Sequence, residues 1–143
     1  MKFAAALLLA MVSAFGVAQE TREDFDQFCR RFFVDRQFQM SRIAFPIVSI
    51  QPNEDGESLD TLTLDRAHWE FERYGWGEKH KKSAGAWSER VYDNFQRKQS
   101  NTLRNTEERV ASLEGIENGI SVHYFFRLKE GKWLLVRHED WSD

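Results

Sequence analysis

The sequence is short of the residues on which several common kinds of site depend. Cys29 is the only cysteine, which excludes an intrachain disulfide and a cysteine-based metal site. The chain has 20 basic and 23 acidic residues and a net charge of −3, so it lacks the basic excess typical of nucleic-acid-binding proteins. We also find no phosphate-binding loop, no serine–histidine–aspartate signature and no closely spaced histidine pair on a helix. We therefore assign no catalytic residue from the sequence, and we expect no cofactor and no nucleic-acid partner.

Long hydrophobic runs are also absent, with one exception at the N-terminus. Met1–Ala18 has one basic residue, Lys2, then an apolar stretch, and small residues precede a cut after Ala18. This pattern is typical of a secretory signal peptide and is too short for a membrane span. We expect an exported protein, periplasmic or extracellular, with no stable membrane insertion and a single domain over residues 19–143. The alternative for Met1–Ala18 is a buried N-terminal helix.

Aromatic residues, in contrast, are abundant, at 14% of the chain, and can build a sizeable core. An apolar stripe at helical spacing predicts a helix that opens at Thr21 and buries one face. The stripe consists of Phe25, Phe28, Cys29, Phe32 and Phe33. Val34–Ser41 continues this helix or forms a short second one. We expect the stripe to cover a sheet, with Cys29 as a small buried hydrophobic residue.

The strongest strand signal lies between Ile120 and Trp141. Apolar and polar residues alternate up to Leu128, and Glu130–Gly131 supplies a tight turn into a second strand, Lys132–Asp140. With a two-residue loop, Tyr124 faces Arg137 and His123 faces His138.

A second turn, Asn118–Gly119, predicts a third antiparallel strand, Arg109–Glu117, which places Glu114 opposite His123. The alternative is a helix over Thr106–Leu113. The predicted buried face of this meander comprises Ala111, Leu113, Val122, Tyr124, Phe126, Leu128, Trp133 and Leu135.

The middle of the chain has weaker signals. A segment around Pro46 (IAFPIVSI) predicts an edge strand, and a polar loop follows it. Thr63 or Asp65 would cap a short helix over Arg66–Tyr74, and Trp87–Phe95 alternates like a strand. The order predicts an α+β fold with helices on one face of a curved antiparallel sheet.

Three groups of side chains are candidates for binding. Arg137 beside Tyr124 would either pair with an acid, such as Asp24 or Asp35, or hold an anionic ligand at a pocket mouth. The aromatic residues, which include Trp69, Tyr92 and Trp133, would pack in the core or line an apolar ligand pocket. The row Glu114–His123–His138 would bind a metal such as zinc or form a polar outer face.

Two stretches also carry a family resemblance. FVDRQFQMSRIAFPI, after the first helix, and YFFRLKEGKWLLVRHED, near the end, resemble the domain-of-unknown-function 4348 family of secreted bacterial proteins. The resemblance covers Phe25 to Trp141. It implies a nuclear transport factor 2-like fold, in which a cone-shaped sheet wraps helices and often encloses a pocket. It implies no activity and no catalytic residue.

We therefore expect a non-catalytic module that binds a small molecule or another protein. The alternative is a small cofactor-free isomerase or dehydratase, which a carboxylate and a tyrosine within hydrogen-bond reach inside a pocket would favour. A third reading is a homodimer formed through the outer face of the sheet.

Overall fold

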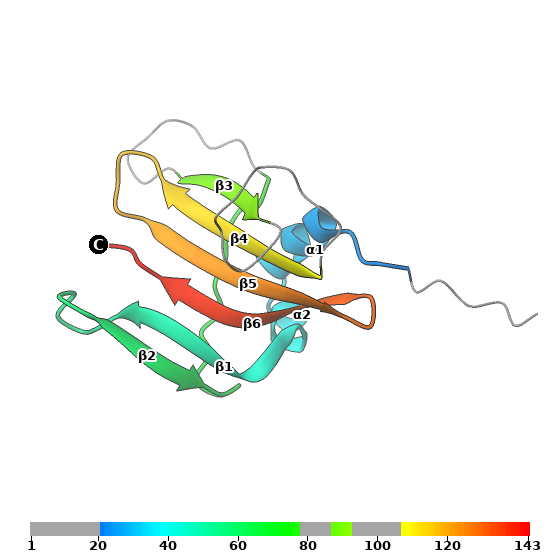
Figure 1. Cartoon of the computed structure of the whole chain (residues 1–143), viewed down its shortest axis with the longest axis horizontal. Coiled ribbons are helices and arrows are strands. Elements are labelled where there is room, and N and C mark those ends of the chain that lie inside the picture. The colour runs from blue at the N-terminus through cyan, green and yellow to red at the C-terminus, as the bar shows by residue number, and fades with distance from the viewer. Residues whose placement is uncertain (1–20, 78–86, 93–106) are drawn as a thin grey trace, which may run out of the picture.

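A computed structural model of the chain describes residues 21–77, 87–92 and 107–143. Six strands form one sheet in the order β2-β1-β6-β5-β4-β3 (Figure 1). Their bounds are Ile43–Pro52 (β1), Leu59–Leu64 (β2), Trp87–Tyr92 (β3), Glu108–Gly115 (β4), Ser121–Lys129 (β5) and Lys132–Asp140 (β6). The fold is α+β as predicted. The sheet, however, is mixed and not purely antiparallel, because β1 pairs with β6 in parallel.

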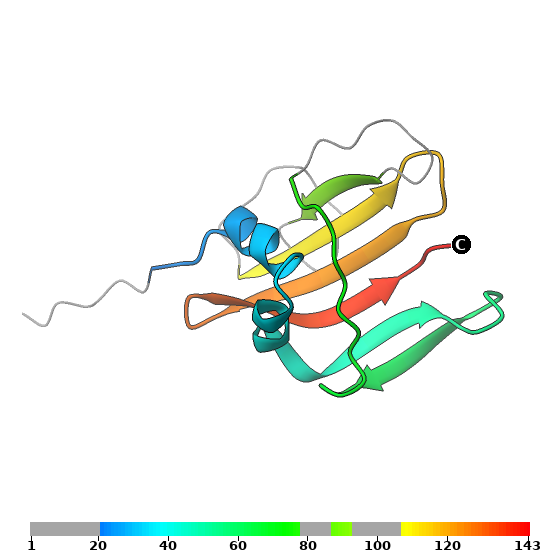
Figure 2. The ribbon, with the colours of Figure 1, turned by 180° about the vertical axis from the view of Figure 1, so that it is seen from behind.

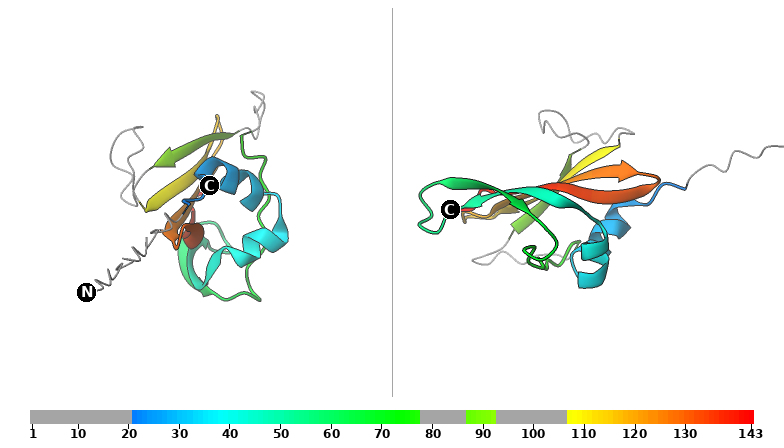
Figure 3. Two further views of the ribbon diagram at one scale, coloured as in Figure 1. Left: turned by 90° about the vertical axis from the view of Figure 1, so that its right-hand side faces the viewer. Right: turned by 90° about the horizontal axis from the view of Figure 1, so that it is seen from below.

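Two short helices lie on one side of this sheet (Figure 3). Helix α1, Phe25–Phe32, begins at Asp24, whose carboxylate accepts a hydrogen bond of 2.8 Å from the Gln27 amide. Helix α2, Arg36–Ser41, begins in the same way at Asp35. The predicted cap at Thr21 was wrong, because an aspartate directly before the apolar stripe can bond the free amides of the first turn. Asp24 and Asp35 are thus caps, and neither pairs with Arg137.

The aromatic stripe of α1 contacts the meander of β4, β5 and β6. The rings of Phe28 and Phe32 meet Phe126 edge-on, with centroids 5.1 and 5.2 Å apart, and Phe33 meets Tyr124 at 4.9 Å. Every residue of the predicted buried face belongs to this core or packs against it. The two-residue period of the sequence therefore identified the buried face of the meander correctly.

The pairing of β5 with β6 follows the predicted register for only half of the hairpin. Phe126 pairs with Leu135 as expected, but the next pair is Phe125 with Arg137, which leaves Val136 as an extra residue on β6. Such a bulge moves all later side chains of the strand to the opposite face. Arg137 therefore leaves the apolar face, where it was predicted, and His138 enters it opposite Tyr124.

The pairing of β4 with β5 is displaced by two residues from the prediction. Leu113 pairs with Val122, and Ser112, not Glu114, lies opposite His123. The loop is longer than two residues because Asn118 accepts a hydrogen bond of 3.1 Å from the Ile120 amide, and the Gly115 amide bonds the Ile120 carbonyl. An even displacement preserves the faces. The strand prediction was correct, and the helix over Thr106–Leu113 was wrong where the structure describes it.

The strand around Pro46 is present, but it is not the edge strand that the sequence predicted. It is β1, which lies between β2 and β6. Pro46 falls within a register irregularity between Ile43 and Val48, where a missing amide proton breaks no regular ladder bond. The strand β2 was not predicted at all.

The helix expected over Arg66–Tyr74 is also absent. The chain instead runs from β2 across the same face of the sheet that the helices cover (Figure 2). Its amides bond other elements: the Tyr74 amide donates to the Phe33 carbonyl at 3.1 Å. These tertiary hydrogen bonds replace the bonds that a helix would make within itself.

Loss of the Phe28 ring tests the packing of α1 on the sheet. Phe28→Ala should lower the free energy of unfolding by roughly 3–5 kcal/mol, because it removes buried apolar surface and leaves a cavity. Urea melts measure this loss. Val34→Ala is the control, since Val34 is 50% exposed just after the same helix and should change stability little. A loss below about 1 kcal/mol for Phe28→Ala would contradict the packing.

Candidate functional site

A polar cavity of about 260 Å³ lies between β1, β6 and the segment that follows β2. We call it the Glu72 pocket. It is lined by Ser49, Gln51, Leu64, His68, Trp69, Glu70, Glu72 and His138. Most of these side chains can donate or accept hydrogen bonds, so the cavity suits a small polar molecule better than a hydrocarbon.

Glu72 is the central residue of this pocket. The Tyr124 hydroxyl donates to its Oε2 at 2.5 Å, and Nε2 of His138 lies 3.4 Å from its Oε1. The Glu72 side chain is 26% exposed, whereas Tyr124 is fully buried beneath it. One carboxylate oxygen is therefore held by the core, and the other faces the imidazole at the edge of the cavity.

His138 forms the floor of the pocket beside Glu72. Its Nδ1 lies 3.0 Å from the Ser49 hydroxyl, and its ring meets the edge of Trp69 at 5.6 Å between centroids. Its side chain is only 5% exposed. When Ser49 donates to Nδ1, the imidazole proton sits on Nε2, on the side that faces Glu72.

Burial displaces the pKa values of these groups in opposite directions. It raises the pKa of Glu72 to about 7, with the charges of Asp140 and Glu70 adding to the rise and the Tyr124 hydrogen bond opposing it. Burial also lowers the pKa of His138 to about 4. Both groups are therefore neutral at pH 5.5, and Glu72 is half ionised near neutrality. Burial, together with the nearby Glu72 carboxylate, raises the pKa of Tyr124 well above its ordinary value.

Gln39 of α2 holds the backbone of Glu72 in place. Its amide nitrogen donates to the carbonyls of Phe32 and Glu72 at 3.1 and 2.9 Å. Its amide oxygen accepts from Trp69 Nε1 at 3.0 Å and from the Glu72 amide at 3.4 Å. The buried side chain uses its hydrogen-bonding capacity to join both helices to the wall of the pocket.

A second and larger cavity, of about 540 Å³, lies near the start of α1. Trp133, Trp76 and Phe25 line it together with Arg22 and Arg109. Three carboxylates also line it, and all three are already bonded: Glu23 binds Arg42, Asp24 accepts from the Gln27 amide, and Asp26 binds Arg30. The cavity carries both positive and negative side chains and lies apart from Glu72 and His138. Its lining therefore points to no particular ligand or reaction.

The candidate binding residues lie in several places. Trp69 lines the Glu72 pocket and Tyr124 bonds its central carboxylate, while Trp133 lines the larger cavity. Tyr92 ends β3, opposite Val110, and lines neither cavity. Arg137 lies on the opposite face of the sheet from Tyr124, ion-paired with Glu139 and over the Phe125 ring. It lines neither cavity.

The candidate row Glu114–His123–His138 does not form as one row. His123 Nε2 does lie 3.0 Å from Glu114 Oε1, but across a diagonal of the β4–β5 pair. His138 lies on the other face of the sheet, because of the bulge at Val136. Within residues 21–77, 87–92 and 107–143, no group of three histidine, cysteine or acidic side chains is arranged to hold a metal ion.

Sequence reasoning missed the residues at the centre of the site. Glu72 lies in the stretch predicted to be helical, and Ser49 and Gln39 carry no pattern of their own. Asp93 has the right chemistry for the base of an isomerase-type mechanism, but it lies outside the residues that the structure describes. The signal that the sequence did carry is the pair Glu70 and Glu72 between Trp69 and Tyr74, which places carboxylates near aromatic side chains.

The comparison with protein families gives a clear result. The sequence matches the domain of unknown function DUF4348 over residues 2–140. The chain belongs to the DUF4348 family. This agrees with the resemblance of the two quoted stretches, and a search of curated proteins found no match.

Solved structures agree on the fold. A nuclear transport factor 2-like protein from Bacteroides fragilis is 26% identical, with a TM-score of 0.56 over 85% of this chain. The DUF4348 chain spans about half of that protein, 48% of its length. A protein from Bacteroides uniformis is 21% identical, with a TM-score of 0.52, and 85% and 78% of the two chains are covered. The nuclear transport factor 2-like resemblance of this DUF4348 protein is therefore shown.

The pKa values of Glu72 and His138 predict opposite pH dependences for two variants. The lowered pKa of His138 gives a stability that is full above pH 6.5 and lost as the pH falls toward 4. The raised pKa of Glu72 gives a stability that is full below pH 4.5 and lost as the pH rises toward 7. In the wild type the two effects oppose each other.

Urea melts at pH 4.5 and pH 7 should separate them. As the pH rises from 4.5 to 7, the free energy of unfolding of Glu72→Gln should increase by roughly 2–3 kcal/mol relative to that of the wild type. The free energy of unfolding of His138→Gln should decrease by a similar amount relative to the wild type. Glu57→Gln, at an exposed position of the β1–β2 loop, should follow the wild type. Parallel pH curves for all four proteins would contradict the assigned shifts.

Proposed function

We propose that this DUF4348 protein is an exported module that binds a small polar molecule in the Glu72 pocket. The observation that carries the proposal is a carboxylate with a raised pKa, partly exposed in a polar cavity and fixed by Tyr124. Partly solvated polar groups of perturbed pKa in a cleft are typical of binding and catalytic sites. In this proposal the curved sheet and its helices form the cone of the nuclear transport factor 2-like fold.

The size and lining of the pocket support a small ligand. A cavity of about 260 Å³ is smaller than the sites that hold drug-sized molecules, which begin at roughly 300 Å³. Hydroxyl, amide, imidazole and carboxylate groups converge on it, whereas Trp69 and Leu64 give it an apolar wall. Such a site recognises its ligand by hydrogen bonds and by shape.

Export and the absence of a sheet dimer are further parts of the proposal. The pattern of Met1–Ala18 supports export, and it lies outside the described residues. Over the chain segments that the structure does describe, no helix is long and apolar enough to cross a membrane. A homodimer through the outer sheet face has less support, because Val110, Ser112 and Phe125 on that face are already buried within a single chain.

Native mass spectrometry of the protein recovered from its own exported fraction tests this proposal. We expect a chain that starts at Gln19, accompanied by a retained small molecule. Gln51→Trp should abolish retention by filling the pocket, because Gln51 lines it. Val48→Trp is the matched control on the other face of the same strand, where Val48 is 41% exposed. A chain that keeps Met1 would contradict export, and retention unaffected by Gln51→Trp would contradict the site.

A cofactor-free isomerase or dehydratase is a second candidate, and one observation favours it. The Tyr124 hydroxyl lies within hydrogen-bond reach of Glu72 next to a pocket, and a carboxylate and a tyrosine in this arrangement favour such an enzyme. A base with a pKa of about 7 is half ionised at neutral pH and can take a proton from a carbon acid. In that reading Glu72 Oε1 would accept the proton, and His138 would stay neutral.

Nitrobenzisoxazole is a suitable probe of that second candidate. Its ring opens when a base removes one carbon-bound proton: the C–H electrons complete the nitrile, the N–O bond breaks, and its electrons go to the oxygen, which gives one coloured cyano-nitrophenolate. We expect an acceleration of roughly 10²-fold over buffer that rises through pH 7 and disappears in Glu72→Gln. Glu57→Gln should keep the full rate. A rate equal in Glu72→Gln and wild type would reject Glu72 as a base.

A further inference from the structure

We propose that the Glu72 pocket selects small molecules that carry a primary ammonium group. This inference rests on the proposed binding function and names the chemical class of its ligand. It is carried by the charges that line the pocket, by the apolar ring that forms one wall, and by the surroundings of Glu72.

The lining is acidic in charge. Glu70 and Glu72 both line the cavity, and none of the described lining residues is a lysine or an arginine. The lining imidazole of His68 is already engaged, with its Nδ1 2.7 Å from the Asp65 carboxylate. An anionic ligand would therefore meet two carboxylates and no fixed cation, which costs free energy at short range. A cation would meet the opposite charge on two sides.

Glu72 in particular lacks a compensating positive charge in the described structure. The groups that face it are Tyr124 on β5, His138 and Asp140 on β6, and Tyr74 and Glu70 on its own segment. The raised pKa values of the two tyrosines keep them neutral at pH 7, and the lowered pKa of His138 leaves its imidazole neutral. Asp140 and Glu70 are acids and add no positive charge.

Burying a carboxylate without a cation is costly, which is why the pKa of Glu72 rises to about 7. A bound ammonium group would supply that cation. It can donate to Glu72 Oε1, the oxygen that does not carry the Tyr124 hydrogen bond.

The remaining walls suit the rest of such a ligand. The indole nitrogen of Trp69 donates to Gln39, so Trp69 offers the pocket its apolar ring and not its N–H group. A tryptophan ring attracts cations and covers alkyl carbon. Ser49 and Gln51, on neighbouring inward positions of β1, offer oxygen acceptors for further N–H groups. The small volume limits the ligand to a short carbon chain.

Three probes of nearly equal size test the charge selection: n-butylamine, n-butanol and butyrate. NMR titration of the full chain, followed at the Trp69 indole resonance, gives the dissociation constants. We expect butylamine to bind at least tenfold more tightly than either of the others. Because Glu72 attracts the cation only when it is ionised, the apparent affinity should rise about tenfold between pH 6 and pH 8. Calorimetry in two buffers should show a proton released on binding below pH 7.

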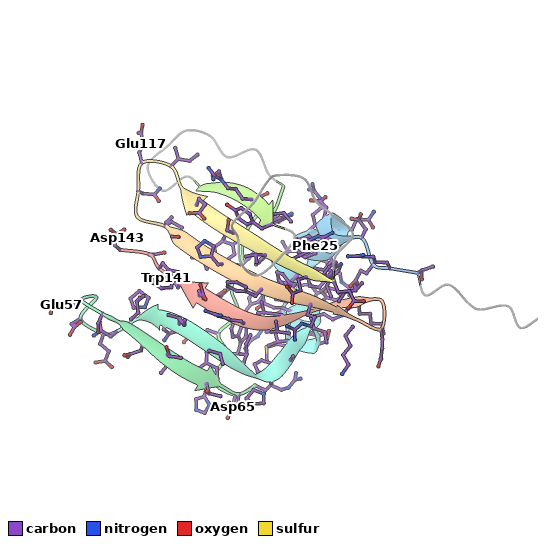
Figure 4. The ribbon with its side chains drawn as sticks, in the orientation of Figure 1. Phe25, Glu57, Asp65, Glu117, Trp141 and Asp143 are labelled. Atoms are coloured by element: carbon purple, nitrogen blue, oxygen red, sulfur yellow. The ribbon has the colours of Figure 1, made fainter. Side chains whose placement is uncertain are left out.

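Variants at two lining positions and one remote position complete the test. Glu72→Gln should weaken butylamine binding at least tenfold and remove its pH dependence. Glu70→Gln should weaken butylamine binding about threefold and keep its pH dependence, because Glu70 is exposed and its charge is screened by solvent. Glu57→Gln should change nothing, since Glu57 lies at the tip of the β1–β2 hairpin (Figure 4).

The outcomes separate this inference from the function on which it rests. Tighter binding of butanol or butyrate at the same Trp69 resonance would overturn the cationic class and leave the pocket as a binding site. Butylamine binding that is unchanged in both lining variants would overturn the site. If none of the probes binds and the native protein retains no molecule, the proposed binding function fails as well.

Discussion

The four hydrogen bonds of the buried Gln39 side chain are the interaction on which the site depends. They join α1 and α2 to a segment that has no regular structure of its own. The amide nitrogen of Gln39 bonds backbone carbonyls, and its amide oxygen bonds a backbone amide. These bonds fix the position of the backbone in the way that the hydrogen bonds of a helix or a sheet would. The Trp69–Tyr74 segment thereby becomes a rigid wall opposite the sheet, and Glu72 is held over Tyr124 and His138.

The second constraint is the extra residue Val136 in β6. Without it, the strand would present Arg137 to the apolar face and turn His138 outward. With it, the face receives an imidazole next to Ser49 and Glu72, and Arg137 pairs with Glu139 on the other side. A single inserted residue thus replaces a permanent charge in the core by a group that is neutral at pH 7. Bulges next to binding sites commonly re-aim a side chain in this way.

Sequence patterns predicted the parts of the fold that depend on local regularity. The stripe from Phe25 to Phe33 and the alternation from Val122 to Leu128 report burial directly, so the helix and the inner face of the meander were found. The bulge at Val136 leaves no mark in a two-residue period, so the position of His138 was missed. Glu72 was missed because its conformation is set by Gln39, 33 residues away in the chain, and not by its neighbours. Tertiary hydrogen bonds of this kind override local propensity.

The position of β6 has a consequence for how the molecule acquires its structure. Among the described strands it comes last in the chain, yet it lies between β1 and β5 and joins the two halves of the sheet. A ribosome adds roughly 5–20 residues per second, so the early pair of β1 and β2 waits for several seconds without this central partner. During that interval the pair exposes an unpaired edge and an apolar face, which favour aggregation. The parallel pairing of β1 with β6 thus makes formation of the core a late event of high contact order.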